Sequence, residues 1–379
     1  MISQSTNKYL ELEFDDKEVE FLIREKGFYY DDILLNSLKK VRDACLKNRV
    51  KNVRFGVNAS PEENLSKLLR VDTLEYAHRI KSLGYDFISL NLAQYLAISY
   101  FGKSGRPEDR GSYQSVLPKS HYDLFLELVD KLKEKLDFIF HLPTDDFIYE
   151  DPTDKLFLNC LHLAHQLSAI TPQTILPLSF HAYRAKKSSN LEHDLQVSKS
   201  KTADLIIRTA RFFNHLEKKT KIKLTLALEM TNQELPTSHF VKYCTSPYQV
   251  LETYYLASKK DSAALVEKYL AEGIFSVTCD IGNFLLDQKF NQLTATGGRP
   301  TTTGSSLYYG FEEFCRKISV YHINNVQHPE YLSNYLDNRR GGEFENKFGQ
   351  LPAHHYPSLL TDADKVGEVM KQIELFQNM

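Results

Sequence analysis

Short apolar stretches alternate with longer amphipathic stretches along most of this chain of 379 residues. The apolar stretches are rich in β-branched and aromatic residues and have the length of buried strands. They cover residues 53–60, 85–92, 137–143, 174–182, 223–230, 275–280 and 318–326. Apolar residues recur at helical spacing in 72–83, 120–136, 152–169, 196–218, 246–272, 311–317 and 362–376. This alternation predicts an α/β fold with parallel strands, a (β/α)8-type TIM barrel.

The pattern yields seven clear strands, one fewer than a TIM barrel needs. Two alternatives remain for the eighth strand. Either the N-terminal region supplies it, for example Tyr9–Phe14 (YLELEF), or the barrel is incomplete. Residues 1–50 are charged and mixed, and we expect them to form an N-terminal helical cap. Residues 51–379 are then the barrel. No internal repeat divides the chain further.

Five of the predicted strands end in a side chain that can bind a metal ion. The clearest is FSVTCD, which ends at Asp280 and is followed at once by Gly282 and Asn283. An acid at the tip of a buried strand is costly unless something binds it. The full set is His141, His181, Glu229, Asp280 and His322. Catalytic groups of β/α barrels lie at the C-terminal ends of the strands, so we expect these five side chains to converge there.

Imidazole and carboxylate ligands together suit Zn, Mn, Fe or Co better than Ca or Mg alone. Glu229, Asp280 and His322 would form an open site with positions left for water or substrate. His141 and His181 would complete a second site, with Glu229 as the bridge. The sequence therefore predicts a divalent metal ion, Zn or Mn, as the cofactor.

The net charge and the cysteine spacing bear on the binding partners of the protein and on its cellular compartment. The net charge of −2 provides no overall field that would draw the protein to nucleic acid or to an acidic membrane. The five cysteines are widely spaced without a CxxC motif, which is typical of a reducing compartment. The first residues lack the layout of a signal peptide, and no stretch approaches the ~20 apolar residues of a membrane span. We expect a cytoplasmic protein.

Long polar connections follow three of the strands, at 101–119, 294–310 and 327–357. Connections of this kind carry function at the upper face of a barrel, and we expect these three to wall one pocket. A basic stretch also follows His181 and contains Arg184, Lys186 and Lys187. It either holds a phosphate or is a solvated surface.

The ordered set FHLP, FHAYR, LALEMTN, CDIGNF and YHINN resembles the xylose isomerase-like TIM barrel superfamily. That superfamily contains sugar and sugar-phosphate isomerases and epimerases, and repair enzymes of the endonuclease IV type. The resemblance implies that Glu229, Asp280 and His322 bind a divalent metal. The DIGN form at Asp280–Asn283 is similar to the epimerases, whereas His141 and His181 resemble the endonuclease branch, where they would hold an additional zinc.

We expect Asn91, at the tip of its strand, and Arg184, in the basic stretch, to bind substrate, together with Asn283 and His354. One departure concerns the last strand, from which the superfamily supplies a final Glu as a metal ligand and often as a second acid/base. No matching strand follows His322. Glu345 or Glu374 would have to substitute.

These residues favour a metal-dependent isomerase or epimerase acting on a small sugar or sugar phosphate. Glu229 and His181 would be catalytic, with Glu229 moving a proton at the carbon acid. One alternative is an endonuclease IV-like phosphodiesterase acting on DNA, in which several metals activate water. A second alternative is a metal-dependent oxidase or lyase built on the same barrel. The last alternative is a degenerate, non-catalytic barrel that acts as a binding protein.

Overall fold

The structure is a computed structural model. It describes residues 8–14, 23, 27, 29–58, 73–92, 126, 129–134, 136–142, 155–221, 223–231, 240–260, 262–281, 311–324 and 363–377. The expected connections at 101–119, 294–310 and 327–357 lie outside these residues, as do Asn283, Glu345 and His354.

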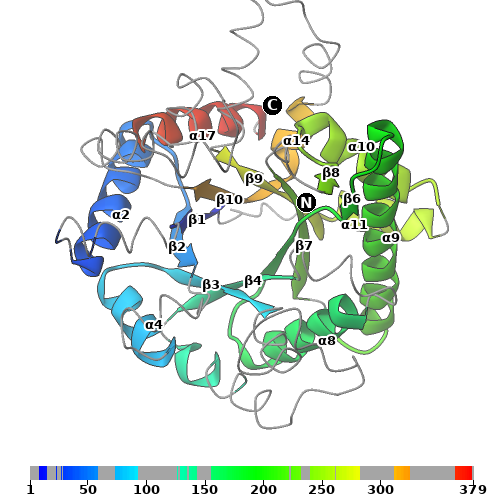
Figure 1. The fold of residues 1–379 in the computed structure, drawn as a ribbon. Coiled ribbons are helices and arrows are strands. Elements are labelled where there is room, and N and C mark those ends of the chain that lie inside the picture. The colour runs from blue at the N-terminus through cyan, green and yellow to red at the C-terminus, as the bar shows by residue number, and fades with distance from the viewer. Residues whose placement is uncertain are drawn as a thin grey trace, which may run out of the picture.

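Eight parallel strands close into a barrel, and helices surround it (Figure 1). The barrel strands are β1 (Lys8–Glu13), β2 (Val53–Asn58), β3 (Phe87–Asn91), β4 (Asp137–His141), β5 (Leu176–Phe180), β7 (Leu224–Met230), β9 (Phe275–Asp280) and β10 (Ile318–Asn324). They pair around the ring in chain order, and β1 closes it by pairing with both β2 and β10. The prediction of a TIM barrel is confirmed.

The eighth strand comes from the N-terminal region, in the segment that reads YLELEF. In β1, Leu10 and Leu12 are fully buried and belong to the main hydrophobic core. Side chains of a strand alternate between its two faces, so Tyr9, Glu11 and Glu13 lie on the opposite face, toward the barrel interior. Residues 8–13 therefore belong to the barrel, and it is the helix after them that covers the barrel from outside.

The described helices are α2 (Tyr30–Lys47), α4 (Thr73–Ser82), α8 (Lys155–Ile170), α9 (Leu191–Glu217), α10 (Pro247–Ala257), α11 (Ala263–Ala271), α14 (Phe311–Lys317) and α17 (Ala363–Gln377). The predicted helix 246–272 is wrong in one respect, because it is two helices. The break lies at Ser262, whose φ of +82° is left-handed and does not continue a right-handed helix. None of the helices described is both long and apolar enough to cross a lipid bilayer.

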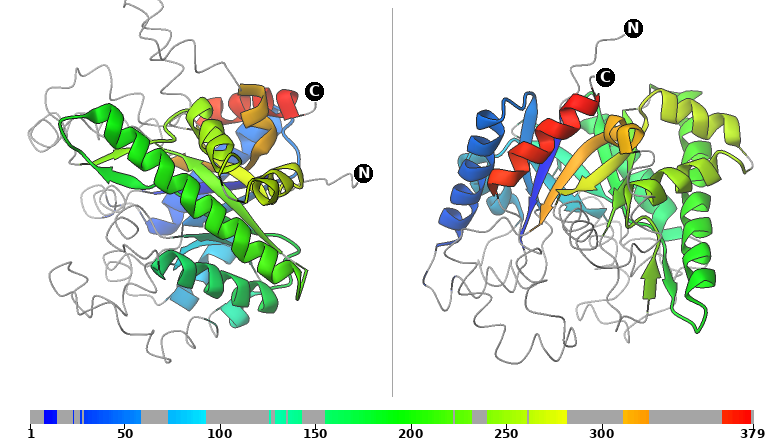
Figure 2. Two further views of the ribbon diagram at one scale, coloured as in Figure 1. Left: turned by 90° about the vertical axis from the view of Figure 1, so that its right-hand side faces the viewer. Right: turned by 90° about the horizontal axis from the view of Figure 1, so that it is seen from above.

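Two further strands lie outside the ring, and neither is among those predicted from the sequence. β6 (Arg184–Lys186) and β8 (Phe240–Lys242) form an antiparallel pair. β6 follows β5 and β8 follows β7, and these two barrel strands are neighbours. We call this pair the β6–β8 ribbon. It lies beside α9 and α10 (Figure 1), and α9 runs across the outside of the barrel as one long helix (Figure 2).

The lower part of the barrel interior is filled by apolar side chains. Tyr9, Phe87, Ile139, Ala227 and Val320 form this cluster, each from a different strand. The ring of Phe87 lies directly against Gly56, where the Cβ atom of any other residue would overlap it. This cluster closes the barrel from below, so polar side chains above it open only toward the C-terminal ends of the strands.

Candidate metal centre

The five residues predicted from strand ends all lie at the C-terminal end of the barrel. Glu229 and His322 lie near the ends of β7 and β10, His141 and Asp280 are the last residues of β4 and β9, and His181 follows β5 directly. Nε2 of His181 is 3.0 Å from Oε2 of Glu229, and Nδ1 of His322 is 3.4 Å from the same oxygen. The rings of His141 and His322 have their centroids 5.0 Å apart. Asp280, 2% exposed, pairs in register with His322.

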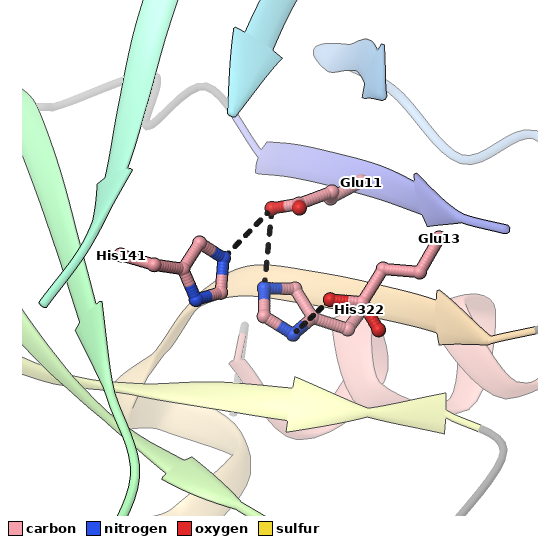
Figure 3. A group of neighbouring side chains, drawn as sticks. All are labelled: Glu11, Glu13, His141 and His322. Atoms are coloured by element: carbon pink, nitrogen blue, oxygen red, sulfur yellow. Dashed lines mark hydrogen bonds and ion pairs between the residues drawn. The ribbon is translucent and has the colours of Figure 1, made fainter. Parts of the chain in front are cut away.

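Two acids of β1 complete this group, and neither was predicted from the sequence as a site residue. Glu11 and Glu13 lie beside His141 and His322 (Figure 3). One ligand atom from each of these four residues lies within 4.8 Å of the others. Oε2 of Glu11 is 3.3 Å from Nε2 of both His141 and His322. Oε1 of Glu13 is 3.5 Å from Nδ1 of His322.

The signal that could have found Glu11 and Glu13 is their spacing. In YLELEF the apolar residues Leu10 and Leu12 alternate with the two acids, so one face of the strand is apolar and the other acidic. If the apolar face packs on helices, the acids must point into the barrel. The spacing separates the acidic face from the apolar one, and the pairing of β1 with β10 shows that the acidic face is the inner one.

Glu374 does not take the place of the missing final Glu. It lies on α17 outside the barrel, where its two carboxylate oxygens contact Nζ of Lys8 at 2.6 Å and of Lys371 at 2.9 Å. Lys8 begins β1, at the end of the barrel opposite to the metal-capable residues. The acid that the structure places next to His322 is Glu11, on β1, the strand that follows β10 around the ring.

The acids and imidazoles shift one another's proton affinity. Burial alone would raise the pKa of Glu11, but His141 and His322 outweigh it and lower the pKa to about 2. Burial opposes the same effect at Glu229, yet His181 and His322 hold the pKa of that carboxyl well below its usual range. Burial raises the pKa of Glu13 despite the nearby His322, and Glu11 and Glu229 add to the rise.

His322 is the central member of the group. Burial would lower the pKa of its imidazole, but the carboxylates of Glu229, Glu11 and Glu13 raise the pKa well above its ordinary value. The side chain is 0% exposed. Among the described residues, neither ring nitrogen has a hydrogen-bond partner of good geometry, and neither does Oε1 of Glu11. Buried polar atoms of this kind are costly unless a proton or a cation is shared between them.

Hydroxyl groups hold Glu229 from below. Ser179 Oγ donates to Oε2 of Glu229 at 3.3 Å and is 2.9 Å from Oγ1 of Thr278. Both hydroxyl residues are fully buried. Second partners of this kind orient a carboxylate that binds a metal.

The donor set fits a divalent metal ion. It contains the imidazoles of His141, His181 and His322 and the carboxylates of Glu11, Glu13, Glu229 and Asp280. This is the mixed nitrogen and oxygen set that Zn and Mn accept. The carboxylates favour the binding of a dication.

The structure describes two of the four residues expected to bind substrate. Asn91 ends β3 and pairs in register with His141. Arg184 lies in β6, half-buried, with its guanidinium carbon 5.4 Å from the centre of the Phe240 ring. The described structure does not extend to Asn283 and His354.

Neither a protein family nor a curated protein sequence matches the chain. Among solved structures, the probable 3-DHS dehydratase AsbF of Bacillus anthracis is 13% identical, with a TM-score of 0.40 over 85% of this chain and 98% of that one. A GH10 endoxylanase from a sugarcane soil metagenome is 10% identical, with a TM-score of 0.36 over 85% and 86%. A dihydropteroate synthetase is 14% identical, with a TM-score of 0.26 over 76% and 93%. Such low similarity carries no argument about function, so the barrel assignment rests on the strand order above.

Proposed function

We propose that this barrel is a divalent-metal-dependent isomerase or epimerase that acts on a small sugar or sugar phosphate. The observation that carries the proposal is the position of His322. It is fully buried, and its two ring nitrogens face Glu11 on one edge and Glu13 and Glu229 on the other. Imidazoles from two further strands, His141 and His181, contact the same acids.

A bound ion would supply a Lewis acid that polarises a carbonyl or hydroxyl oxygen of the substrate. Glu229, Asp280 and His322 are the residues proposed to hold it, as the family resemblance implies, and Glu11 joins them from β1. Ser179 keeps Glu229 oriented by its hydrogen bond. The apolar cluster below the group excludes water from that side, which strengthens electrostatic interactions in the site.

Two carboxyl groups from different strands support proton transfer. Glu229 on β7 and Glu13 on β1 approach the same nitrogen of His322, at 3.4 and 3.5 Å. An isomerase or epimerase removes a proton from carbon and returns one, and a group within hydrogen-bond reach must do each. The sequence provided only Glu229 and His181 for this chemistry, whereas β1 adds a second acid. Glu13 is also more open than Glu229, with 27% of its side chain exposed against 6%.

The substrate is proposed to be a small molecule, because the group lies inside the barrel above its closed floor. Nucleic acid is not favoured as a partner, in keeping with the net charge of −2. A cytoplasmic location remains an expectation from the sequence.

The test combines metal content with exchange of substrate protons. The purified protein is treated with chelator, reloaded separately with Zn²⁺ or Mn²⁺, and assayed for bound ion by mass spectrometry. It is then incubated in D₂O with a panel of aldoses, ketoses and their phosphates. Deuterium at a carbon of one panel member, seen by NMR with its isomer or epimer, is the expected result.

Glu229→Gln should lose both the ion and the exchange, while Glu217→Gln should keep both. Glu217 is a matched control because it pairs with Lys268 on the outer helices, far from the strand ends. Ion binding with cleavage of abasic-site DNA and no sugar exchange would identify the phosphodiesterase instead. A wild-type protein that binds no ion would identify a barrel without this chemistry.

A further inference from the structure

The hydroxyl groups of Ser198 and Thr202 on α9 hold the chain where it leaves β5, the strand that His181 follows. Tyr183, two residues after His181, donates its backbone N–H to Thr202 Oγ1 at 2.9 Å. Ser198 Oγ donates to the carbonyl oxygen of Tyr183. Both peptide groups of Tyr183 are therefore fixed by one helix. Ser198 and Thr202 are fully buried, so water does not compete for these bonds.

Ser198 also binds the second strand of the β6–β8 ribbon. The backbone N–H of Tyr243 donates to Ser198 Oγ at 2.8 Å. In the ribbon, Arg184 pairs with Lys242, so Tyr183 and Tyr243 are the next opposing pair. The Ser198 hydroxyl occupies the place where a direct backbone bond between them would complete the ladder. It joins the two strands and sets their separation at this end of the ribbon.

The residues that follow β8 contact the chain just after Glu229. The N–H of Thr231, two residues after Glu229, donates to the carbonyl oxygen of Cys244 at 3.1 Å. Cys244 follows Tyr243 and has a φ of +59°, an uncommon conformation that surrounding contacts must hold. Tyr243 donates its hydroxyl to Glu252 on α10, and Glu252 pairs with Lys199 of α9 at 2.6 Å. The exits of β5 and β7 are thus joined through α9 and α10.

We infer that Ser198 and Thr202 are positioning residues for the His181–Glu229 pair. The two side chains of this pair lie 3.0 Å apart at the exits of neighbouring strands. Each is followed within two residues by a peptide group that this network holds. His181 follows the last residue of β5, and α9 holds both peptide groups of Tyr183, two residues further along the chain. The consequence for ion binding rests on the proposed function; the consequence for the geometry of the pair does not.

The test uses Ser198→Ala and Thr202→Val, with Thr202→Ser as the conservative variant and Thr209→Val as the control. Thr209 is a buried α9 residue whose hydroxyl donates to Leu205 within the helix, so its loss removes a similar group without touching the ribbon. The first readout is the imidazole ¹⁵N spectrum of His181 in metal-free protein, assigned with His181→Gln. The signal should move in Ser198→Ala and Thr202→Val, and stay at the wild-type position in Thr202→Ser and Thr209→Val.

The second readout is titration with Co²⁺, followed by its visible absorption. Loss of either hydroxyl should weaken Co²⁺ binding roughly tenfold and alter the absorption bands, as loss of an outer partner of a metal ligand does. A His181 signal unchanged in both variants overturns the inference, whether or not ions bind. A moved signal with unchanged Co²⁺ affinity overturns the role of the two hydroxyls in ion binding. If wild type binds no Co²⁺ while the His181 signal moves in the variants, the positioning role stands and the proposed metal function falls.

Discussion

Glu11 and His322 face each other across the seam where the first and last barrel strands pair, with 3.3 Å between Oε2 and Nε2. Their strands lie at opposite ends of the chain, so this contact exists only in the closed barrel. It places an acid and an imidazole, both fully buried, at the centre of the proposed metal centre. The predictions below concern the proposed metal centre, the packing of the helices around the barrel and the burial of the cysteines.

Glu11→Gln should weaken ion binding while preserving the shape of the side chain. An ion that binds only the native state at 100 times its Kd stabilises the protein by about 2.7 kcal/mol. If the variant binds at least about tenfold more weakly, the gain at the same ion concentration falls to about 1.4 kcal/mol or less. Urea unfolding with Zn²⁺ and with chelator measures both gains. Equal gains in wild type and Glu11→Gln would remove Glu11 from the site, and Glu217→Gln serves as the unaffected control.

In the metal-free protein, Glu11 and His322 should together contribute most to stability between pH 4.5 and pH 6.5, the ordinary pKa values of Glu and His. The pKa of Glu11 is lowered, so its contribution is present above 4.5 and is lost as the pH falls toward about 2. The pKa of His322 is raised, so its contribution is present below 6.5 and is lost as the pH rises through the raised value. Urea unfolding in chelator across this pH range measures the profile. His322→Gln should flatten the alkaline side, and stability that rises from pH 6.5 to 9 in wild type contradicts the assignment.

Gly367→Ala should destabilise the packing of α17 on α2. The added Cβ would overlap the carbonyl oxygen of Ala44, which is backbone and has little freedom to move. Overpacking of this kind costs about 1–3 kcal/mol, although alanine is the better helix former. Thermal unfolding should show the loss. Glu368→Ala, an exposed change on the same helix, should be close to neutral, and equal effects in the two variants would contradict the close approach.

The cysteines should be unreactive in the folded protein. All five are free and buried. Burial raises the pKa of Cys45, Cys244 and Cys315 to about 12, so almost no thiolate is present near neutral pH. A disulfide-exchange reagent at pH 8 should modify them only after denaturant is added. Rapid modification of one thiol in native protein would show that its surroundings open.

The sequence by itself determined the elements with a clear local period and the residues at their ends. Strands such as Phe275–Asp280 carry no charge before their last residue and are buried throughout, because both faces of a parallel strand are covered. An acid or histidine at the end of such a strand lies at the C-terminal end of the barrel, because all the strands are parallel. The local pattern was therefore sufficient to place His141, Glu229, Asp280 and His322 at that rim.

Only the tertiary structure decided how the barrel closes and which acids join the site. β1 has an alternating polar pattern that is equally typical of an exposed edge strand, and its partner β10 lies at the other end of the chain. Nothing local distinguishes an acid that faces water from one that faces a buried imidazole. The β6–β8 ribbon also depends on contacts that are distant in the sequence. Hydroxyl groups of α9 hold the chain beside its two short strands. Long-range pairing, which a local period does not encode, places Glu11 and Glu13 at the centre and fixes the exits of β5 and β7.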